Sequence, residues 1–491
     1  MSATHLTQLI GGESRASSSG ATLAVFDPAT GFACASCPSG TQADVDAAVR
    51  AAQAAFPAWS ALPNDARAAW MSRLADALEA RLEAFAQAES RDAGKPIRLV
   101  REIEIPRAVS NLRFFAAAAT QFASESHHGQ AGLNYTLRQP LGAVACISPW
   151  NLPLYLFTWK IAPALAAGNC VVAKPSEITP VTAWMLGELA REIGFPAGVF
   201  NIVHGLGPVV GNALVEHADI KAVSFTGSTA VGRQIAAHCG PALKKMSLEL
   251  GGKNPTLVFA DAFNDENSRE RLLDTVVRSA FQNSGQICLC GSRILVERNV
   301  FDAFREAFVA RVRKLRVGDP QDATTDLGPL VSKAHFDKVL ACIELARSEG
   351  GTVLCGGEAI KVEGRCTDGW FIAPTVIEDL GPDCRSNTEE IFGPVVTLQA
   401  FDDDAHALAL ANATPYGLSA SVWTQQLDRA HRIAANLQSG IVWINTWMLR
   451  DLRTPFGGVG QSGLGREGGV EAMRFFTEPR NVCIALSQGT P

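Results

Sequence analysis

Two cysteines, Cys288 and Cys290, are the first candidates for chemistry in this chain of 491 residues. They lie in the stretch FQNSGQICLCGSR, residues 281–293, after a Gly-Gln pair in otherwise apolar surroundings. A cysteine can act as a nucleophile, bind a metal, form a disulfide or fill a core as a small apolar side chain. The spacing of these two residues leaves all four alternatives open.

The remaining cysteines argue against a metal site and against a disulfide framework. Cys34 and Cys37 form a C-x-x-C pair, but a zinc site needs a second pair, and the next cysteine is Cys146. We therefore expect no metal, and we interpret CASC as small residues of a β-hairpin, with a redox pair as the alternative. Because the N-terminus lacks the pattern of an export signal, the scattered cysteines predict reduced thiols and a cytoplasmic protein.

Composition narrows the class of protein further. The chain is 47% apolar and contains 43 glycines and 25 prolines, which is typical of a globular enzyme of two or three domains. Its net charge of −6, without a run of five Lys or Arg residues, argues against a nucleic-acid partner or an acidic membrane surface. No apolar stretch of about 18 residues is free of charge, so we expect no membrane span.

The elements that must position these residues follow two successive alternations of strands and helices. Apolar strands are predicted at 142–148, 170–175, 199–205 and 222–227, with helices near 157–167, 179–193, 208–216 and 229–239. A second alternation begins after Gly251. Both predict parallel sheets covered by helices on both faces. The strand-like stretches 131–139 and 480–487 belong to neither sheet, and we expect them to pair as an arm at an interface.

Two glycine-rich loops are weak candidates for a phosphate site. GLGPVVG, residues 205–211, has one residue too many for the dinucleotide fingerprint G-x-G-x-x-G, and GSTAVG, residues 227–232, also departs from it. The second loop nevertheless lies at a strand end and opens a helix, whose N-terminal amides favour a phosphate. An ordinary strand–helix turn is the alternative for both loops.

Seven motifs then occur in one order: SPWNLPLY (148–155), KPSE (174–177), FTGSTAVG (225–232), LELGGKNP (248–255), GQIC (285–288), EEIFGPV (389–395) and PFGG (455–458). Together they resemble the NAD(P)-dependent aldehyde dehydrogenase superfamily over nearly the whole chain. The stretches EIPRAVSNLRFF (104–115) and NTWMLRDLRTPFGG (445–458) look like the subgroup of 2-aminomuconic and 2-hydroxymuconic semialdehyde dehydrogenases.

The resemblance implies a catalytic set of three residues. Cys288 would be the nucleophile that attacks the aldehyde, and Cys290 would remain a core residue. The side chain of Asn151, with the backbone N–H of Cys288, would stabilise the oxyanion. Glu249 would activate water to hydrolyse the thioester; because relatives that transfer the acyl group to coenzyme A lack this residue as a rule, water is the expected acceptor.

The resemblance also implies the cofactor site. Lys174 and Glu177 would meet the adenine ribose, and because a carboxylate repels a 2′-phosphate, NAD is favoured over NADP. Further residues would contact the pyrophosphate, the nicotinamide ribose or the nicotinamide ring, or would lie beside these groups. They are Trp150, Ser176, Gly227, Ser228, Gly232, Glu390 and Phe392.

In the subgroup that the chain resembles, two arginines hold the substrate carboxylate, and the matching positions are Arg107 and Arg450. A planar guanidinium can bind a carboxylate in bidentate fashion. The alternatives are structural ion pairs with Glu104 or Asp451. Arg113 and Arg453 are nearby arginines that could hold the carboxylate instead. Thr446 and the sequence GGVGQSG depart from the subgroup pattern.

We therefore expect an α/β fold of the aldehyde dehydrogenase type in three parts. A Rossmann-type NAD-binding domain would comprise 1–123 and 141–251, an α/β catalytic domain 252–455, and a β bridging arm 124–140 and 456–491. The expected function is oxidation of a semialdehyde that carries a carboxylate, in a homodimer or homotetramer. A general or amino-aldehyde dehydrogenase and a non-catalytic binding protein on the same fold are the alternatives.

Overall fold

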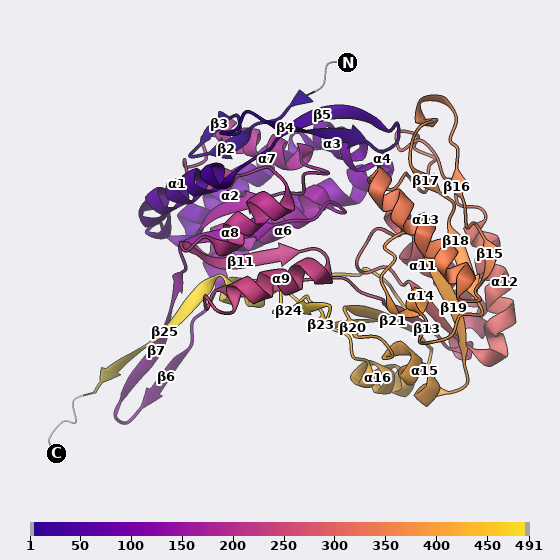
Figure 1. Cartoon of the computed structure of the whole chain (residues 1–491). Coiled ribbons are helices and arrows are strands. Elements are labelled where there is room, and N and C mark those ends of the chain that lie inside the picture. The colour runs from indigo at the N-terminus through magenta and orange to yellow at the C-terminus, as the bar shows by residue number, and fades with distance from the viewer. Residues whose placement is uncertain (1–3, 487–491) are drawn as a thin grey trace.

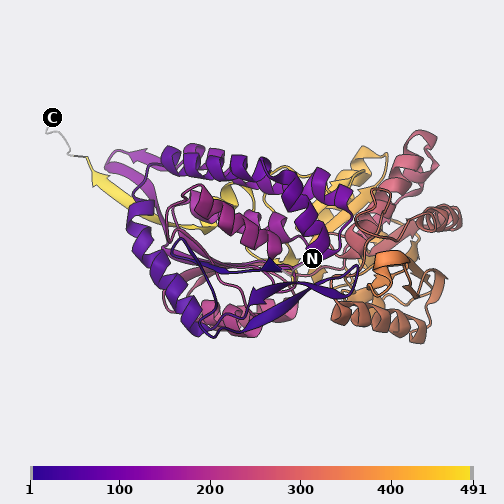
Figure 2. The ribbon, with the colours of Figure 1, turned by 90° about the horizontal axis from the view of Figure 1, so that it is seen from above.

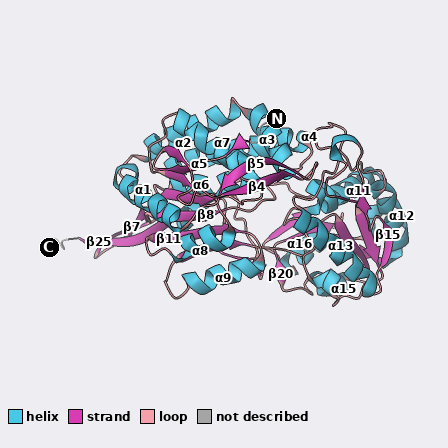
Figure 3. Cartoon of the chain, turned by 45° about the horizontal axis from the view of Figure 1, so that its top comes forward, coloured by secondary structure: helices cyan, strands magenta, loops and turns pink. Residues whose placement is uncertain are grey.

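The computed structural model of the protein describes residues 4–486, which form two large sheets and several small ones. The two sheets occupy separate halves of the molecule, and a narrow arm projects from one half (Figure 1). Helices cover both faces of the sheets, as the two alternations of strands and helices predicted (Figure 3).

The first large sheet has a parallel centre and antiparallel edges. Its order is β24 (Gly463–Leu464), β12 (Lys245–Glu249), β11 (Ile220–Thr226), β8 (Ala143–Ile147), β9 (Cys170–Lys174), β10 (Phe200–Ile202), β2 (Gln8–Ile10) and β3 (Glu13–Arg15). The four predicted strands are β8, β9, β10 and β11, and β8 and β9 are entirely buried.

The helices around this sheet are largely apolar on the side that they bury. They are α1 (Gln42–Ser60), α2 (Asn64–Glu79), α3 (Leu82–Ala93), α4 (Ile97–Leu99), α5 (Ile105–Gln121), α6 (Pro153–Ala166), α7 (Val181–Glu192), α8 (Asn212–Glu216) and α9 (Thr229–Cys239). The helix predicted near 157–167 begins earlier, at Pro153, because proline suits the first turn of a helix. Every residue of α6 is buried, and α5 packs against it.

The second large sheet is parallel except for its edge strand β15. Its order is β15 (Thr352–Cys355), β18 (Thr375–Glu378), β19 (Val395–Phe401), β14 (Arg293–Glu297), β13 (Pro255–Val258), β21 (Ser419–Trp423) and β22 (Ile441–Ile444). The helices of this half are α10 (Ala260–Asn264), α11 (Glu266–Phe281), α12 (Phe301–Val312), α13 (Lys333–Ser348), α14 (Arg385–Thr388), α15 (Asp404–Ala411) and α16 (Leu427–Asn436).

Small sheets complete the fold. β1 (Thr4–His5), β5 (Phe32–Pro38) and β4 (Thr22–Asp27) form one, and the hairpin of β4 and β5 holds the CASC stretch, as predicted. Two further strand pairs are β16 (Ala359–Ile360) with β17 (Phe371–Ile372), and β20 (Tyr416–Gly417) with β23 (Val459–Gly460). All twelve cysteines are free thiols.

The arm is an antiparallel sheet of β6 (Ser126–Gly129), β7 (Gly132–Pro140) and β25 (Thr477–Ala485). The predicted pairing of the two strand-like stretches is confirmed, and a view from above shows the arm extending away from both halves (Figure 2). The range 456–491 is longer than the C-terminal strand of the arm, because β24 joins the first large sheet and α17 (Gly469–Phe475) packs against α6. Among residues 4–486, no helix is long and apolar enough to cross a membrane.

Candidate active site

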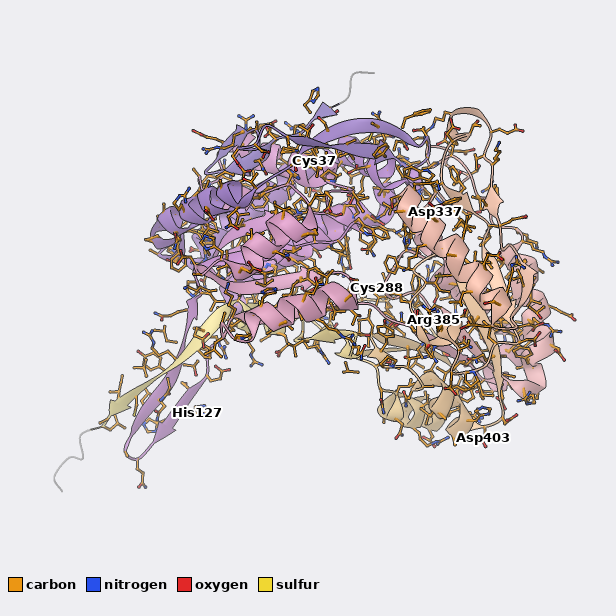
Figure 4. The ribbon with its side chains drawn as sticks, in the orientation of Figure 1. Cys37, His127, Cys288, Asp337, Arg385 and Asp403 are labelled. Atoms are coloured by element: carbon orange, nitrogen blue, oxygen red, sulfur yellow. The ribbon has the colours of Figure 1, made fainter. Side chains whose placement is uncertain are left out.

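A pocket of about 170 Å³ gathers seven of the predicted site residues from different parts of the chain. Cys288 lies between the two halves of the molecule (Figure 4). The pocket is lined by Pro149, Trp150, Asn151, Thr226, Gly227, Ser228, Leu250, Gly251, Cys288, His335, Lys338, Glu390 and Phe392. Glu249 precedes two of these residues at the carboxyl end of β12. The pocket thus lies where the first sheet faces the second half of the chain.

Cys288 is carried by a strained turn between α11 and β14. Asn283 and Ser284 both adopt positive φ angles of 54°, which non-glycine residues rarely do. Gly285 follows with φ 71°, and a Cβ there would overlap the carbonyl oxygen of Gly393. Asn254 Nδ2 donates hydrogen bonds to the carbonyl oxygen of Cys288, at 2.7 Å, and to that of Cys290, at 2.9 Å. The turn is therefore fixed from both sides.

The two cysteines differ in access. Cys288 is half-buried and lines the pocket, whereas Cys290 is buried in the core. Burial raises the pKa of the Cys288 thiol well above its ordinary value, and the nearby carboxyls of Glu390 and Glu249 raise it further, while Arg450 opposes them. The thiol is therefore protonated at neutral pH, and its proton must be removed before the sulfur can act as a thiolate.

Asn151 lies beside the cysteine turn, in the loop that joins β8 to α6. Its Nδ2 donates to the carbonyl oxygen of Gln286 at 3.0 Å, and Asn283 Nδ2 donates to the carbonyl oxygen of Asn151 at 3.1 Å. These bonds hold the Asn151 amide, a hydrogen-bond donor, against the segment that carries Cys288. Such a donor can stabilise negative charge on an oxygen bound near that sulfur.

Glu249 is buried, and within residues 4–486 neither of its carboxylate oxygens has a hydrogen-bond partner. Burial raises its pKa well above the ordinary value of 4.5, and the neighbouring Glu467 raises it further. The positive charges of Lys160, Arg466 and Arg450 oppose this effect. A buried carboxyl without hydrogen-bond partners is costly unless it has a role.

Lys160 and Glu467 form a buried ion pair that sequence reasoning missed. Lys160 Nζ lies 2.7 Å from Glu467 Oε1 and 3.2 Å from Ser224 Oγ. Glu467 is the carboxyl that raises the pKa of Glu249. A single lysine within the otherwise apolar helix PLYLFTWKIAPALA was the available signal, because a buried charge needs a partner.

Lys174 is the last residue of β9 and Glu177 follows it in the next turn, apart from the cysteine pocket. Lys174 Nζ donates to Glu177 Oε2 at 3.0 Å, and the N–H of Gly207 donates to Glu177 Oε1 at 3.4 Å. Burial acts to raise the pKa of Glu177, but the Lys174 charge and these hydrogen bonds lower it overall, so the side chain is a carboxylate. Ser176 Oγ accepts from the N–H of Ile178 at 3.2 Å and shapes the turn.

Ser228 caps the N-terminus of α9. Its Oγ accepts from the N–H of Val231 at 3.3 Å. A Cβ at Gly227 would overlap the ring of Phe225, and one at Gly232 would overlap Leu250. Glycine therefore fits both positions without displacing a neighbour. The exposed start of this helix presents backbone amides to the pocket, which is the usual setting for a phosphate.

The opposite wall of the pocket is formed by Glu390 and three rings. Glu390 Oε1 accepts from the N–H of Gly252 at 3.0 Å, and burial raises the pKa of this carboxyl. Trp150 and Phe392 meet edge to face with ring centroids 5.3 Å apart, and Phe392 has a positive φ of 62°. His335 Nε2 lies 2.7 Å from the carbonyl oxygen of Phe392.

His335 and Lys338 were not predicted, although both line the pocket. They lie on α13, which carries no motif that the sequence analysis singled out. The arrangement fits a dinucleotide: a helix N-terminus for the phosphates, carboxylates for ribose hydroxyls, and rings for a flat heterocycle.

Arg107 and Arg450 line a different pocket, of about 950 Å³. Arg107 comes from α5 and Arg450 from the loop after β22. Two nitrogens of the Arg107 guanidinium, Nε and Nη2, are buried without a partner in the described part of the chain. Arg450 Nη1 donates to Tyr155 Oη at 2.6 Å, and its Cζ lies 4.0 Å from the ring centroid of Phe456.

The two carboxylates considered as alternative partners form ion pairs with other residues. Glu104 pairs with Lys95, and Asp451 pairs with Arg453 at 2.5 Å. Arg113, the other nearby arginine, is on the surface and pairs with Asp76 and Glu79. Within residues 4–486, Arg107 and Arg450 therefore form no ion pair.

Comparison with known proteins identifies similar chains. The model of the aldehyde dehydrogenase family matches residues 15–482. A 2-aminomuconic semialdehyde dehydrogenase from Danio rerio is 49% identical over 94% of each chain. A 2-hydroxymuconic semialdehyde dehydrogenase from a Pseudomonas species is 43% identical over 98% of this chain and 100% of the relative. The crystal structure of PnpE, also from a Pseudomonas species, superposes with a TM-score of 0.94 at 42% identity, over 99% of each chain.

Proposed function

The chain belongs to the aldehyde dehydrogenase family, and from that premise we propose that it oxidises a semialdehyde whose far end carries a carboxylate. The substrate would be of the 2-aminomuconic or 2-hydroxymuconic semialdehyde type, as the names of its relatives indicate. The observation that carries this proposal is the pocket with two arginines that no carboxylate of residues 4–486 neutralises.

Catalysis would begin at Cys288. The thiol first loses its proton to solvent water, and the sulfur then attacks the aldehyde carbon as a thiolate. The side chain of Asn151 and the backbone N–H of Cys288 would hold the resulting oxyanion. The dinucleotide, when bound, supplies the acceptor for the hydride that leaves this adduct.

Loss of the hydride leaves a thioester on Cys288. Glu249 would then take a proton from water, the hydroxide would attack the thioester carbon, and the carboxylic acid would depart as the thiol is restored. The burial of Glu249 and its lack of protein hydrogen-bond partners support this role. Water is therefore the proposed acceptor of the acyl group.

The family uses NAD(P), and we propose NAD for this chain. The Glu177 carboxylate, held by Lys174 and the N–H of Gly207, would accept hydrogen bonds from ribose hydroxyls and repel a 2′-phosphate. Ser228 and Gly227 would meet the pyrophosphate with Trp150, and Glu390 and Phe392 the nicotinamide riboside.

We also propose that the chain assembles as a homodimer or homotetramer through the arm. Within residues 4–486 the strands of the arm pair only with one another, and the arm extends from the body of the protein (Figure 2). An extended sheet with unpaired edges is a ready surface for another chain.

The arginines provide the test of the substrate class. Arg450→Ala and Arg107→Ala should each lower kcat/KM about 30- to 1,000-fold on 2-hydroxymuconic semialdehyde, the effect of losing about 2–4 kcal/mol of charge-assisted binding. On a neutral six-carbon aldehyde, kcat/KM should change little. Arg113→Ala, on the exposed side of the same helix as Arg107, is the matched control and should resemble the wild type.

Equal losses on both aldehydes would contradict the proposed substrate class. The arginines would then be structural, and the protein would be a general aldehyde dehydrogenase.

A further inference from the structure

Tyr155 lies between the two arginines of the larger pocket. Its hydroxyl oxygen accepts a hydrogen bond from Arg450 Nη1 at 2.6 Å. Its ring centroid lies 5.6 Å from Cζ of Arg107, within range of a cation–π interaction. Tyr155 is buried and is one of only three tyrosines in the chain. A single phenol therefore contacts both cations.

The backbone of Tyr155 is fixed to the helix that carries Arg107. Tyr155 lies in the first turn of α6, and Asn111 Nδ2 donates to its carbonyl oxygen at 3.0 Å. Asn111 follows Arg107 by four residues, so both project from the same face of α5. The same amide also donates to Thr158 Oγ1 at 3.1 Å. The distance from Arg107 to the phenol is thus set by two packed helices.

Arg450, in contrast, lies on a loop and needs an external support. Met448, two residues earlier, has a positive φ of 59°, and the arginine itself is partly exposed. The rings of Phe456 and Trp159 lie 4.0 and 5.2 Å from its Cζ, but ring faces do not fix the direction of its N–H groups. The Tyr155 hydroxyl is the side-chain acceptor, among the described residues, that does so.

A neutral acceptor has a consequence that a carboxylate would not have. A carboxylate at this position would orient Arg450 equally well but would cancel the charge that attracts an anionic substrate. A phenol is uncharged at neutral pH, so it can hold the guanidinium and leave its charge available.

We propose that Tyr155 is a positioning residue that orients Arg450 toward Arg107 and so creates the preference for aldehydes with a distal carboxylate. This inference rests on the proposed function, because it assigns to the hydroxyl the alignment of the two arginines on that carboxylate. Tyr155 itself would act through Arg450 and not on the aldehyde group.

Tyr155→Phe tests the proposal, because it removes the hydroxyl and keeps the ring. On 2-hydroxymuconic semialdehyde, kcat/KM should fall about 10- to 150-fold, the usual effect of losing one hydrogen bond to a charged group. The loss should fall mainly on KM, and a neutral six-carbon aldehyde should keep its kcat/KM. Tyr135→Phe, in the arm, is the matched control and should behave as the wild type.

A double-mutant cycle separates this role from general support of the fold. If the hydroxyl acts through Arg450, adding Tyr155→Phe to Arg450→Ala should cause no further loss on the carboxylated substrate. If the decreases in kcat/KM from the two substitutions multiply in the double variant, the proposal is overturned. It is also overturned if Tyr155→Phe lowers kcat/KM equally on both aldehydes.

The cycle also distinguishes the two proposals. A selective loss in Arg450→Ala with unchanged selectivity in Tyr155→Phe would overturn the role of Tyr155 and leave the substrate class standing. Equal decreases of kcat/KM on both aldehydes in Arg450→Ala would overturn both the substrate class and the role of Tyr155.

Discussion

At the scale of single residues, Cys288 and Cys290 have similar chemistry and different surroundings. Only Cys288 lines the pocket, while Cys290 lies in the core. Cys288→Ser should lower NADH formation by more than about a thousandfold, because a hydroxyl is far less ionised and less nucleophilic than a thiol. Cys290→Ser should keep most of the activity. Steady-state absorbance of NADH measures both, and the reverse result would assign the nucleophile to Cys290.

Glu249 leads to a prediction about the second half of the reaction. Glu249→Ala should release one equivalent of NADH in a burst and then turn over about 100- to 10,000-fold more slowly, because general base catalysis is lost. Rapid mixing measures the burst, and mass spectrometry should find the acyl group on Cys288. Normal steady-state turnover would exclude Glu249 as the base.

The raised pKa of Glu249 also leads to a prediction about the pH dependence of turnover. A base acts in its deprotonated form, and burial with the nearby Glu467 raises its pKa well above 4.5. Hydrolysis should therefore weaken as pH falls through that raised value, at a higher pH than an ordinary glutamate would cause. Glu249→Ala should lose this acidic limb of the profile.

Sequence could predict the residues that the motifs contain, but not their distant partners. Asn151, Cys288 and Glu390 were found at the pocket because each lies in a recognisable stretch. Lys160 and Glu467 are separated by 307 positions, and Arg450 and Tyr155 by 295. Nothing in local spacing connects such pairs, because the packing of α6 against the C-terminal segment brings them together.

At the scale of elements, the turn after β9 leads to a prediction about the choice between NAD and NADP. Glu177 is a half-buried carboxylate paired with Lys174. The wild type should prefer NAD to NADP. Glu177→Gln should lower the ratio of kcat/KM with NAD to kcat/KM with NADP about tenfold, because the repulsion of a 2′-phosphate is removed. Competing kcat/KM values for the two cofactors measure this. Glu192→Gln, at the exposed end of α7, is the control, and a wild-type preference for NADP would refute the assignment.

Strand and helix patterns predicted the parallel centre of the first sheet, where apolar strands alternate with helices. They did not predict the turns that position the chemistry. Asn283, Ser284 and Phe392 adopt positive φ angles. Such conformations are imposed by tertiary contacts, such as the close approach of Gly285 to Gly393, and residue type alone does not reveal them.

At the scale of the whole molecule, the arm leads to a prediction about assembly. Leu137 and Ile484, on its paired strands, are 39% and 49% exposed. The double variant Leu137→Asp/Ile484→Asp should form a smaller species than the wild type, because charge on a buried interface costs several kcal/mol. Light scattering after gel filtration measures the mass. Leu427→Asp, at a site 71% exposed on α16, should leave the mass unchanged, and a monomeric wild type would rule out the proposed assembly.

The two pockets of this protein share no lining residue. Twelve of the fifteen residues around the pocket with the arginines come from one continuous segment, 440–456. Substitutions within that segment therefore change the pocket with the arginines and leave every lining residue of the cysteine pocket in place. A library confined to that segment would vary the residues around the proposed distal carboxylate, with Arg450 held constant because its charge also lowers the pKa values of Cys288 and Glu249.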